Sequence, residues 1–212
     1  MKPLFLLAVF PVVLMGWMSC SRSGTGHAAL PDPRTVDKSV PEYKNPFHPS
    51  TYAHFVARKD YRKTYDVYKD DTLLNRQPKK SRKIFVCLDE QRGQYLVDGL
   101  VAMDFPLSSG VKAYPTKTGD YAVISKKEDH TSNLYGKMYD AEGKCINYNA
   151  ESTDPVPEGG RFDGSPMPYW QRLTNAGLGL HVGKVRRHPV SHGCVRLPRN
   201  VAEILYRQTS IG

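Results

Sequence analysis

The residues with the clearest chemistry lie near the end of the chain, in the tetrapeptide Ser191–Cys194 (Ser-His-Gly-Cys). A second histidine, His181, lies thirteen positions before Cys194. A free thiol is only about a few per cent ionised at neutral pH, and the thiolate is the nucleophile. A cysteine that attacks a carbonyl therefore needs a base beside it, and an imidazole can accept the proton. These residue types predict acyl transfer through a cysteine nucleophile.

Gly193 has a separate role beside the nucleophile. Because glycine has no side chain, the backbone amides of Gly193 and Cys194 can approach a reacting carbonyl and stabilise its negative charge. His181 follows Gly-Leu-Gly-Leu, which is typical of a strand that ends in a loop, where functional groups gather. We therefore expect Cys194 to act as nucleophile, His181 as general base and Gly193 as part of an oxyanion hole.

The neighbours of Cys194 leave more than one interpretation open. Alternate residues of a strand share a face, so His192 and Arg196 are expected on the side of Cys194. His192 either assists the ionisation of the thiol and lines the substrate groove, or forms hydrogen bonds that shape the loop. Arg196 either binds a substrate carboxylate through two parallel hydrogen bonds or is a surface cation. Ser191, which we count among the substrate-binding residues, is expected to orient a neighbour rather than to attack.

A metal site is the competing chemistry. Zinc-competent side chains gather over fourteen residues at His181, His188, His192 and Cys194. Their spacings match no paired-ligand pattern, and a structural zinc ion would quench the thiolate. The chain also contains no phosphate-binding loop and no dinucleotide fingerprint. We therefore expect neither a metal nor another cofactor.

Residues 1–20 are expected to be a signal peptide. Their apolar run, Leu4–Trp17, is too short to span a membrane well. It ends at Cys20 preceded by serine, which is typical of a bacterial lipoprotein signal and predicts lipidation of Cys20 after cleavage. The alternative is simple secretion with cleavage near Ala28. Both alternatives predict an exported protein of the periplasm or cell envelope, anchored to the membrane by lipid in the first.

Charge and composition narrow the class of partner and of fold. The net charge of +9 at pH 7 favours an anionic partner such as a cell-wall polymer or a lipid surface, or else a solvated basic surface without a partner. Export argues against nucleic acid. The 17 glycines, 16 prolines and 13 tyrosines favour a loop-rich β or α+β domain over a helical bundle.

Along the chain we expect a signal peptide at 1–20, a tether rich in proline and serine at 21–50, an ordered extension at 51–81 and a catalytic domain at 82–212. Apolar and β-branched runs predict strands at 83–88, 94–97, 100–105, 119–124 and 178–182, with a hairpin turn at Asp98-Gly99. One helix is expected at 198–208. The polar residues 127–166 are typical of a functional lid or a disordered insert. Cys87 and Cys145 are either small buried side chains or a disulfide pair.

Taken together, Gly179–His181 followed by Ser191–Leu197 resembles the active-site signature of the L,D-transpeptidase catalytic domain, also called the YkuD domain. Other elements of this sequence follow in the family's order: Asp89–Arg92, the Asp98-Gly99 hairpin, Phe105–Gly110, Tyr114–Gly119 and Met167–Trp170. The resemblance covers about residues 82–212.

The resemblance implies a mostly β domain with short helices, built as a β-sandwich-like mixed sheet. It also implies an exchange of amide bonds in peptidoglycan. Cys194 would attack a stem tetrapeptide, release D-alanine and pass the thioester to an amine of a second stem or of a wall-anchored protein. His192 and the backbone at Gly193 and Cys194 would support the oxyanion. Arg196, Tyr169 and Trp170 would line the groove.

This sequence departs from the family's pattern in two places, and three rival functions stay open beside the one that the resemblance implies. The interval of thirteen residues between the histidine and the cysteine is shorter than in some members. The chain also stops at Gly212, where many relatives continue with a strand, which predicts a truncated chain or a missing strand. The rivals are an L,D-carboxypeptidase or endopeptidase that passes the same thioester to water, a non-catalytic wall-binding lipoprotein, and a zinc protein.

Overall fold

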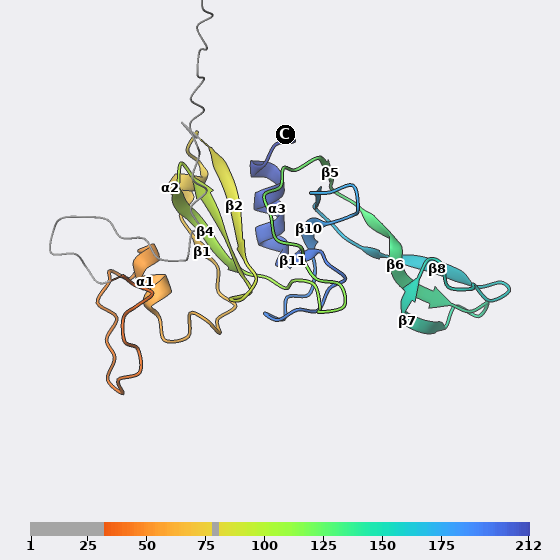
Figure 1. The fold of residues 1–212 in the computed structure, drawn as a ribbon, viewed down its shortest axis with the longest axis horizontal. Helices are drawn as coiled ribbons and strands as arrows, with labels where there is room; N and C mark the ends of the chain where they lie inside the picture. Colours follow the sequence, from red (N-terminus) through yellow and green to blue (C-terminus); the bar gives the residue numbers. More distant parts are fainter. Residues whose placement is uncertain (1–31, 78–80) are drawn as a thin grey trace, which may run out of the picture.

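The computed structural model describes residues 32–77 and 81–212. The predicted signal peptide, the lipidation site at Cys20 and the first part of the tether lie outside the described residues. The described chain is mostly β, with short helices and separate small sheets (Figure 1). The predicted fold class, a mostly β domain with short helices and a mixed sheet, is confirmed.

The first sheet is antiparallel, in the order β1-β4-β3-β2. Its strands are β1 (Tyr68–Lys69), β2 (Arg82–Cys87), β3 (Arg92–Val97) and β4 (Leu100–Pro106). The predicted hairpin between β3 and β4 is confirmed. Asp98 and Gly99 both have positive φ, 52° and 84°, which is the conformation that a tight two-residue hairpin turn requires.

The second sheet holds the histidine and the strand after the cysteine. Its order is β11-β10-β9-β5, from β5 (Ser125–Lys127), β9 (Trp170–Arg172), β10 (Gly179–Val182) and β11 (Val195–Leu197). Strands β10 and β11 are parallel, whereas β9 pairs antiparallel with both β10 and β5. The predicted strand at 178–182 is therefore confirmed.

The strand expected at 119–124 is wrong. Regular pairing begins only at Ser125, the first residue of β5. The chain bends at Gly119, which has φ 150°, and the Tyr121 hydroxyl donates to the Lys117 carbonyl. Of these residues, Ile124 bonds to the sheet, because its amide donates to the Arg172 carbonyl at 2.8 Å just before β5 begins.

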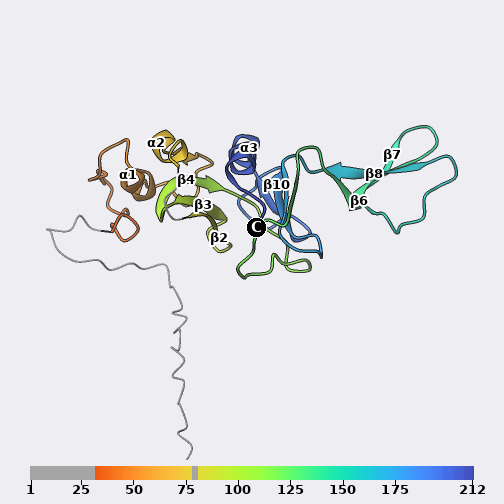
Figure 2. The ribbon, with the colours of Figure 1, turned by 90° about the horizontal axis from the view of Figure 1, so that it is seen from above.

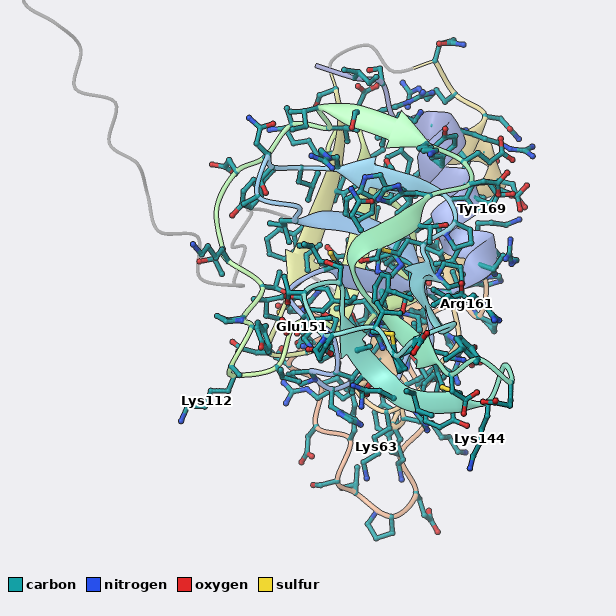
Figure 3. All side chains as sticks on the ribbon, turned by 90° about the vertical axis from the view of Figure 1, so that its right-hand side faces the viewer. Lys63, Lys112, Lys144, Glu151, Arg161 and Tyr169 are labelled. Carbon is teal, nitrogen blue, oxygen red and sulfur yellow. The ribbon has the colours of Figure 1, made fainter. Side chains whose placement is uncertain are left out.

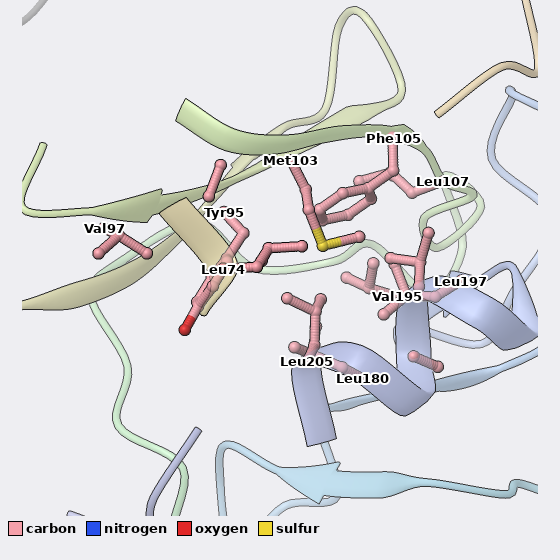
Figure 4. Packing of buried hydrophobic residues seen from close by; sticks show 13 residues of the cluster. Leu74, Tyr95, Val97, Met103, Phe105, Leu107, Leu180, Val195, Leu197 and Leu205 are labelled. Atoms are coloured by element: carbon pink, nitrogen blue, oxygen red, sulfur yellow. The ribbon is translucent and has the colours of Figure 1, made fainter. Parts of the chain in front are cut away.

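The core lies between the two sheets and helix α3 (Arg199–Gln208), as Figure 4 shows. Val201, Ala202 and Leu205 form the buried face of α3, which agrees with the predicted helix. They pack with fully buried residues of β4, among them Met103 and Phe105, and with residues of β10 and β11. Pro198 is the N-cap of α3 rather than a residue of its first turn.

Residues 131–166, here called the lid, form a third sheet in the order β7-β6-β8. Its strands are β6 (Thr131–Tyr139), β7 (Cys145–Glu151) and β8 (Arg161–Pro166). The lid projects from one end of the molecule, beyond β5 and β9 (Figures 1 and 2). Figure 3 looks onto this end, where Lys144, Glu151 and Arg161 are labelled. The polar stretch that was expected to be a lid or a disordered insert is thus an ordered sheet.

The N-terminal residues pack at the opposite end, where α1 (Tyr52–Ala57) and α2 (Asp71–Leu74) lie against the first sheet (Figures 1 and 2). Asp70 is the N-cap of α2, and its side chain accepts a hydrogen bond from the Leu73 amide.

The contact between the N-terminal residues and the first sheet is centred on a buried ion pair. Arg92 Nε donates to Asp104 Oδ1 at 2.6 Å, with side chains 2% and 0% exposed. Asp104 Oδ2 accepts from the hydroxyls of Tyr52 at 2.7 Å and Tyr61 at 2.9 Å. Burial and the nearby Asp104 charge raise the pKa of both tyrosines, so both stay neutral donors. The Arg92 guanidinium also lies over the Phe55 and Tyr61 rings.

The disulfide considered for Cys87 and Cys145 can be compared with the structure. Cys87 lies on β2 and Cys145 on β7, in different sheets and half-buried, so a disulfide between them is not formed. Over residues 32–77 and 81–212, the helices are all too short or too polar to cross a membrane.

The buried ion pair gives the first prediction. Replacing Asp104 by asparagine leaves the buried Arg92 charge without a counter-ion, so Asp104→Asn should lower the free energy of unfolding by about 3–5 kcal/mol. The control is Glu203→Gln, which breaks the exposed pair with Arg207 on α3 and should cost no more than about 0.5 kcal/mol. Urea denaturation measures both, and similar losses in the two variants would show that the buried pair contributes no more to stability than the exposed one.

Candidate active site

The parallel pairing of β10 with β11 places the histidine and the cysteine on one face of the second sheet. Leu180 lies opposite Val195 and His181 opposite Arg196. Leu180 and Val195 face the core, so His181, Arg196 and the preceding Cys194 belong to the other face. Strand geometry places the Cα atoms of His181 and Cys194 roughly 8 Å apart, which their side chains can span.

The His181 ring is neutral and held in one tautomer. Its side chain is buried, with the residue 7% exposed, and Nδ1 lies 2.7 Å from the Val182 carbonyl oxygen. A carbonyl can only accept, so Nδ1 carries the proton and Nε2 keeps a lone pair. Burial lowers the pKa of His181 to about 4, with smaller contributions in the same direction from Arg196 and His130. The ring is therefore uncharged at neutral pH.

Cys194 is also neutral in the resting site. Burial raises the pKa of its thiol, while a hydrogen bond from the Gly179 backbone and the charge of Arg196 act in the opposite direction. The Sγ atom lies 3.3 Å from the Gly177 carbonyl oxygen, which accepts the thiol proton. Both groups are therefore neutral in the resting site, which disfavours a preformed thiolate and imidazolium pair.

The backbone before the cysteine is fixed by Ser191 and Gly193. Gly193 has φ 108°, which favours glycine and turns the chain into the nucleophile. The Ser191 side chain is buried, donates to the Cys194 carbonyl at 2.5 Å and accepts from the Gly193 amide at 3.2 Å. Ser191 thus orients its neighbours, and of the two amides expected in the oxyanion hole, that of Gly193 is engaged within the loop.

Thr116 was not singled out from the sequence as a site residue, although it lies in the Pro-Thr-x-Thr-Gly stretch. Its hydroxyl donates to the Gly193 carbonyl at 2.6 Å and accepts from the Gly110 amide at 2.8 Å. A Cβ atom on Gly110 would lie 2.1 Å from the Tyr114 carbonyl oxygen, so this close approach requires glycine. Thr116 therefore fastens the cysteine loop to the 110–116 turn.

A buried polar network supports the same loop from below. The Gln91 side chain donates to Ser109 Oγ at 2.7 Å and accepts from the Ser109 amide at 2.9 Å. The Ser109 carbonyl in turn accepts from the amides of Val190 and Ser191. No sequence pattern indicates this role of Gln91, because Ser109 lies eighteen residues away.

His192 departs from the expected position on the strand. The chain bends at 192–193, so the alternation that was expected to place His192 beside Cys194 does not apply there. The exposed His192 ring stacks on Tyr135 of the lid, with centroids 4.3 Å apart, and meets the edge of Tyr114. Burial raises the pKa of Tyr135, and Cys194 acts in the same direction, so the lid tyrosine lies within electrostatic range of the thiol.

The remaining predicted residues occupy different places. Arg196 is half-buried on the Cys194 face of β11, and burial lowers the pKa of its guanidinium. Trp170 is 3% exposed, stacks on His130 at 5.0 Å and lies 6.0 Å from the His181 ring. Tyr169 has a positive φ of 55° and packs against Tyr206. Trp170 thus adjoins the base, whereas the Tyr169 ring points to α3.

His188 lies on the exposed part of the loop, with Nδ1 3.3 Å from the Pro189 carbonyl oxygen. No three side chains of histidine, cysteine, aspartate or glutamate in the described part of the chain come close enough to hold a metal ion. Among the four residues considered for zinc, His188 is exposed on the loop and the His192 ring stacks on Tyr135, while His181 is buried.

Comparison with known proteins places this site in a family. The model of the L,D-transpeptidase catalytic domain, YkuD, matches residues 81–212. The match spans more than half of the chain, which therefore belongs to this family. No curated protein matches the chain.

Solved L,D-transpeptidase structures are also similar. One is from Stackebrandtia nassauensis, with 23% identity over 65% of this chain and 55% of that chain and a TM-score of 0.45. Another is from Mycobacterium smegmatis, with 23% identity over 59% and 52% and a TM-score of 0.44. A third is from Enterococcus faecium, with 26% identity over 62% and 47% and a TM-score of 0.44. The chain spans about half the length of each.

The neutral state of His181 gives a prediction for stability against pH. The pKa of His181 is about 4 in the folded protein and near 6.5 in the unfolded chain, so the unfolded state binds a proton first as pH falls. The contribution to the free energy of unfolding is complete above about pH 6.5, is lost progressively towards pH 4, and amounts to about 3 kcal/mol. Urea titrations across this range should show the loss in the wild type.

His181→Gln should remove this part of the pH dependence, because glutamine does not titrate. The matched control is His188→Gln, which replaces an exposed histidine of the neighbouring loop and should leave the curve of the wild type unchanged. A His181→Gln curve that still follows the wild type would show that another group causes the loss.

Proposed function

We propose that the chain is a peptidoglycan L,D-transpeptidase in which Cys194 is the nucleophile and His181 the general base. The observation that supports this most directly is the tautomer of His181. Its Nδ1 is committed to the Val182 carbonyl, so Nε2 is the acceptor on the face that carries the thiol. Membership in a family of cysteine L,D-transpeptidases supports the same reaction class.

In the first half-reaction, Cys194 Sγ attacks the carbonyl that links the third residue of a stem tetrapeptide to its terminal D-alanine. The thiol proton passes to His181 Nε2, and the amide of Cys194 stabilises the oxyanion. The carbon–nitrogen bond then breaks, and His181 returns the proton to the leaving amine of D-alanine. The products are free D-alanine and a thioester on Cys194.

In the second half-reaction, a side-chain amine of a second stem, or of a wall-anchored protein, attacks the thioester carbonyl. His181 accepts the proton that this amine loses and returns it to the departing sulfur. One amide replaces another, so no ATP is consumed, which suits an exported enzyme of the periplasm or cell envelope. A lipid on Cys20 is the anchor that we propose for it.

A basic cavity beside the site supports an anionic donor. It has a volume of about 870 Å³ and is lined by residues of β5, β9 and the start of the lid, among them Lys127, His130 and Arg172. None of the described residues that line it is acidic. Its walls include Trp170, which lies next to His181, and Asn175, in the turn whose Gly177 carbonyl accepts from Cys194. Stem peptides carry free carboxylates, which such a cavity attracts.

Mass spectrometry of the protein incubated with a disaccharide-tetrapeptide tests the proposal. The expected result is an acyl adduct on Cys194, release of D-alanine and a cross-linked dimer. Cys194→Ala should show none of these. His181→Ala should slow acylation about 10²–10⁴-fold, whereas His188→Ala should not.

Other outcomes would assign a rival function. D-alanine release without a dimer would indicate a carboxypeptidase or endopeptidase. Unchanged wall association in Cys194→Ala, with no adduct on the wild type, would indicate a non-catalytic wall-binding protein. Cross-linking at the wild-type rate in Cys194→Ala would refute the proposed nucleophile.

The cavity gives a separate prediction. Arg172→Gln removes a cation from its wall and should raise KM for the tetrapeptide about 10–150-fold with little change in kcat, since a charge-assisted hydrogen bond contributes about 1.5–3 kcal/mol. Arg207→Gln, on the exposed surface of α3, is the control and should leave KM unchanged. Steady-state D-alanine release measures both, and equal KM values for Arg172→Gln and the wild type would remove the cavity from the donor site.

A further inference from the structure

The loop that carries the nucleophile, residues 183–194, joins the two parallel strands and is here called the active-site loop. Its second half is held from within the family domain. Val190 and Ser191 donate to the Ser109 carbonyl, and Thr116 binds the Gly193 carbonyl. In its first half, the Gly183 amide donates to the Leu197 carbonyl at 3.0 Å and the Arg186 amide to Ser108 Oγ at 2.8 Å. The side-chain hydrogen bonds that join this half to the rest of the chain reach Glu90 inside the family domain, and Thr64 and Tyr65, which precede it.

Arg187 joins this half of the loop both to the residues before the family domain and to the domain itself. Its Nη1 donates to the Thr64 carbonyl at 3.0 Å, and its Nη2 donates to the Glu90 carbonyl at 3.0 Å. The Tyr65 hydroxyl adds a hydrogen bond at 3.2 Å to the carbonyl of Arg186. Arg187 itself has a positive φ of 56°, which is unfavourable for a residue other than glycine and needs support from its surroundings.

The Thr64 carbonyl is held by a second, buried arginine. It also accepts from Arg92 Nη1 at 3.2 Å, and Arg92 is the buried cation of the ion pair with Asp104. Asp104 accepts from the hydroxyls of Tyr52 and Tyr61. The N-terminal segment, residues 52–66, is therefore attached to the buried ion pair near both of its ends, at Tyr52 and at Thr64. The position of Arg187 is therefore set by the same buried cluster that attaches the segment to the first sheet.

The second partner of Arg187, the Glu90 carbonyl, is linked to the loop next to Cys194 through Gln91 and Ser109. Glu90 immediately precedes Gln91, whose side chain binds both the amide and the hydroxyl of Ser109. Ser109 in turn holds the amides of Val190 and Ser191. One guanidinium thus connects the N-terminal segment, the turn at 88–91 and the active-site loop.

We propose that the N-terminal segment, residues 52–66, positions the active-site loop through Arg187. Arg187 is a positioning residue, because it acts on Cys194 through the loop. Without the Arg187 side chain, residues 184–189 lose their hydrogen bonds to the Thr64 and Glu90 carbonyls. The backbone of the loop next to Cys194 then becomes more mobile. Displacement of a reacting group by about 1 Å can cost about 10²-fold in rate. The catalytic part of this inference rests on the proposed function, whereas the ordering of the loop does not.

The test uses the full chain with Arg187→Met and, as the matched control, Arg186→Met. Arg186 is exposed, and in the described part of the chain it forms hydrogen bonds through its backbone. Hydrogen exchange should show faster exchange at residues 188–194 in Arg187→Met and no change in Arg186→Met. With the disaccharide-tetrapeptide, kcat for acylation should fall at least about tenfold at unchanged KM in Arg187→Met alone.

Two further variants keep the proposal falsifiable if Arg187→Met does not fold. Arg187→Lys keeps the charge and can reach one of the two carbonyls, so it should recover part of the exchange protection and of kcat. Tyr65→Phe removes a single exposed hydroxyl and should produce a smaller change in the same direction. Equal exchange at 188–194 in the wild type and all of these variants would overturn the proposal.

The two proposals can fail separately. Faster loop exchange in Arg187→Met, in a wild-type protein that never forms an adduct, would retain the positioning role and refute the transpeptidase assignment. Faster exchange with unchanged kcat in an active enzyme would show that Arg187 orders the loop without affecting the reaction, and would overturn the catalytic part of the inference.

Discussion

The parallel pairing of β10 with β11 is the constraint on which the rest of the site depends. It places His181 and Cys194 on one face, but parallel strands cannot be joined by a tight turn and need a connection of about a dozen residues, usually helical. Here the connection, residues 183–194, contains no helix. Its backbone groups must therefore find partners elsewhere, which explains why so many distant residues bind this loop.

Those partners come from segments that are far apart in the sequence. Ser109 and Thr116 hold the half of the loop next to the nucleophile, while Thr64 binds the half next to the base through Arg187. The N-terminal residues and the lid lie at opposite ends of the molecule (Figure 1), so they act on different sides of the loop. The lid contributes Tyr135, which covers His192, and the N-terminal segment fixes the backbone.

Burial sets the electrostatics of the site. It lowers the pKa of His181 and raises that of Cys194, so both groups are neutral before substrate binds. A neutral pair incurs no cost for a charge in a low-dielectric environment, and charge develops only as the thiol attacks. The resting thiol is then a weak nucleophile, and in the proposed reaction it gains reactivity only when a substrate is aligned with both His181 and the backbone amide of Cys194.

The sequence alone determined the family, the candidate site residues and several local elements. Residue type and spacing predict Cys194, His181 and Gly193 as site residues, and the Asp98-Gly99 hairpin and the helix at 199–208 follow from local turn and periodicity rules. Only the tertiary structure decided the contacts of Gln91, Thr116 and Arg187, because each joins residues distant in sequence and leaves no periodic signal. It also decided the position of His192, since the left-handed backbone at Gly193 interrupts the alternation on which the prediction relied.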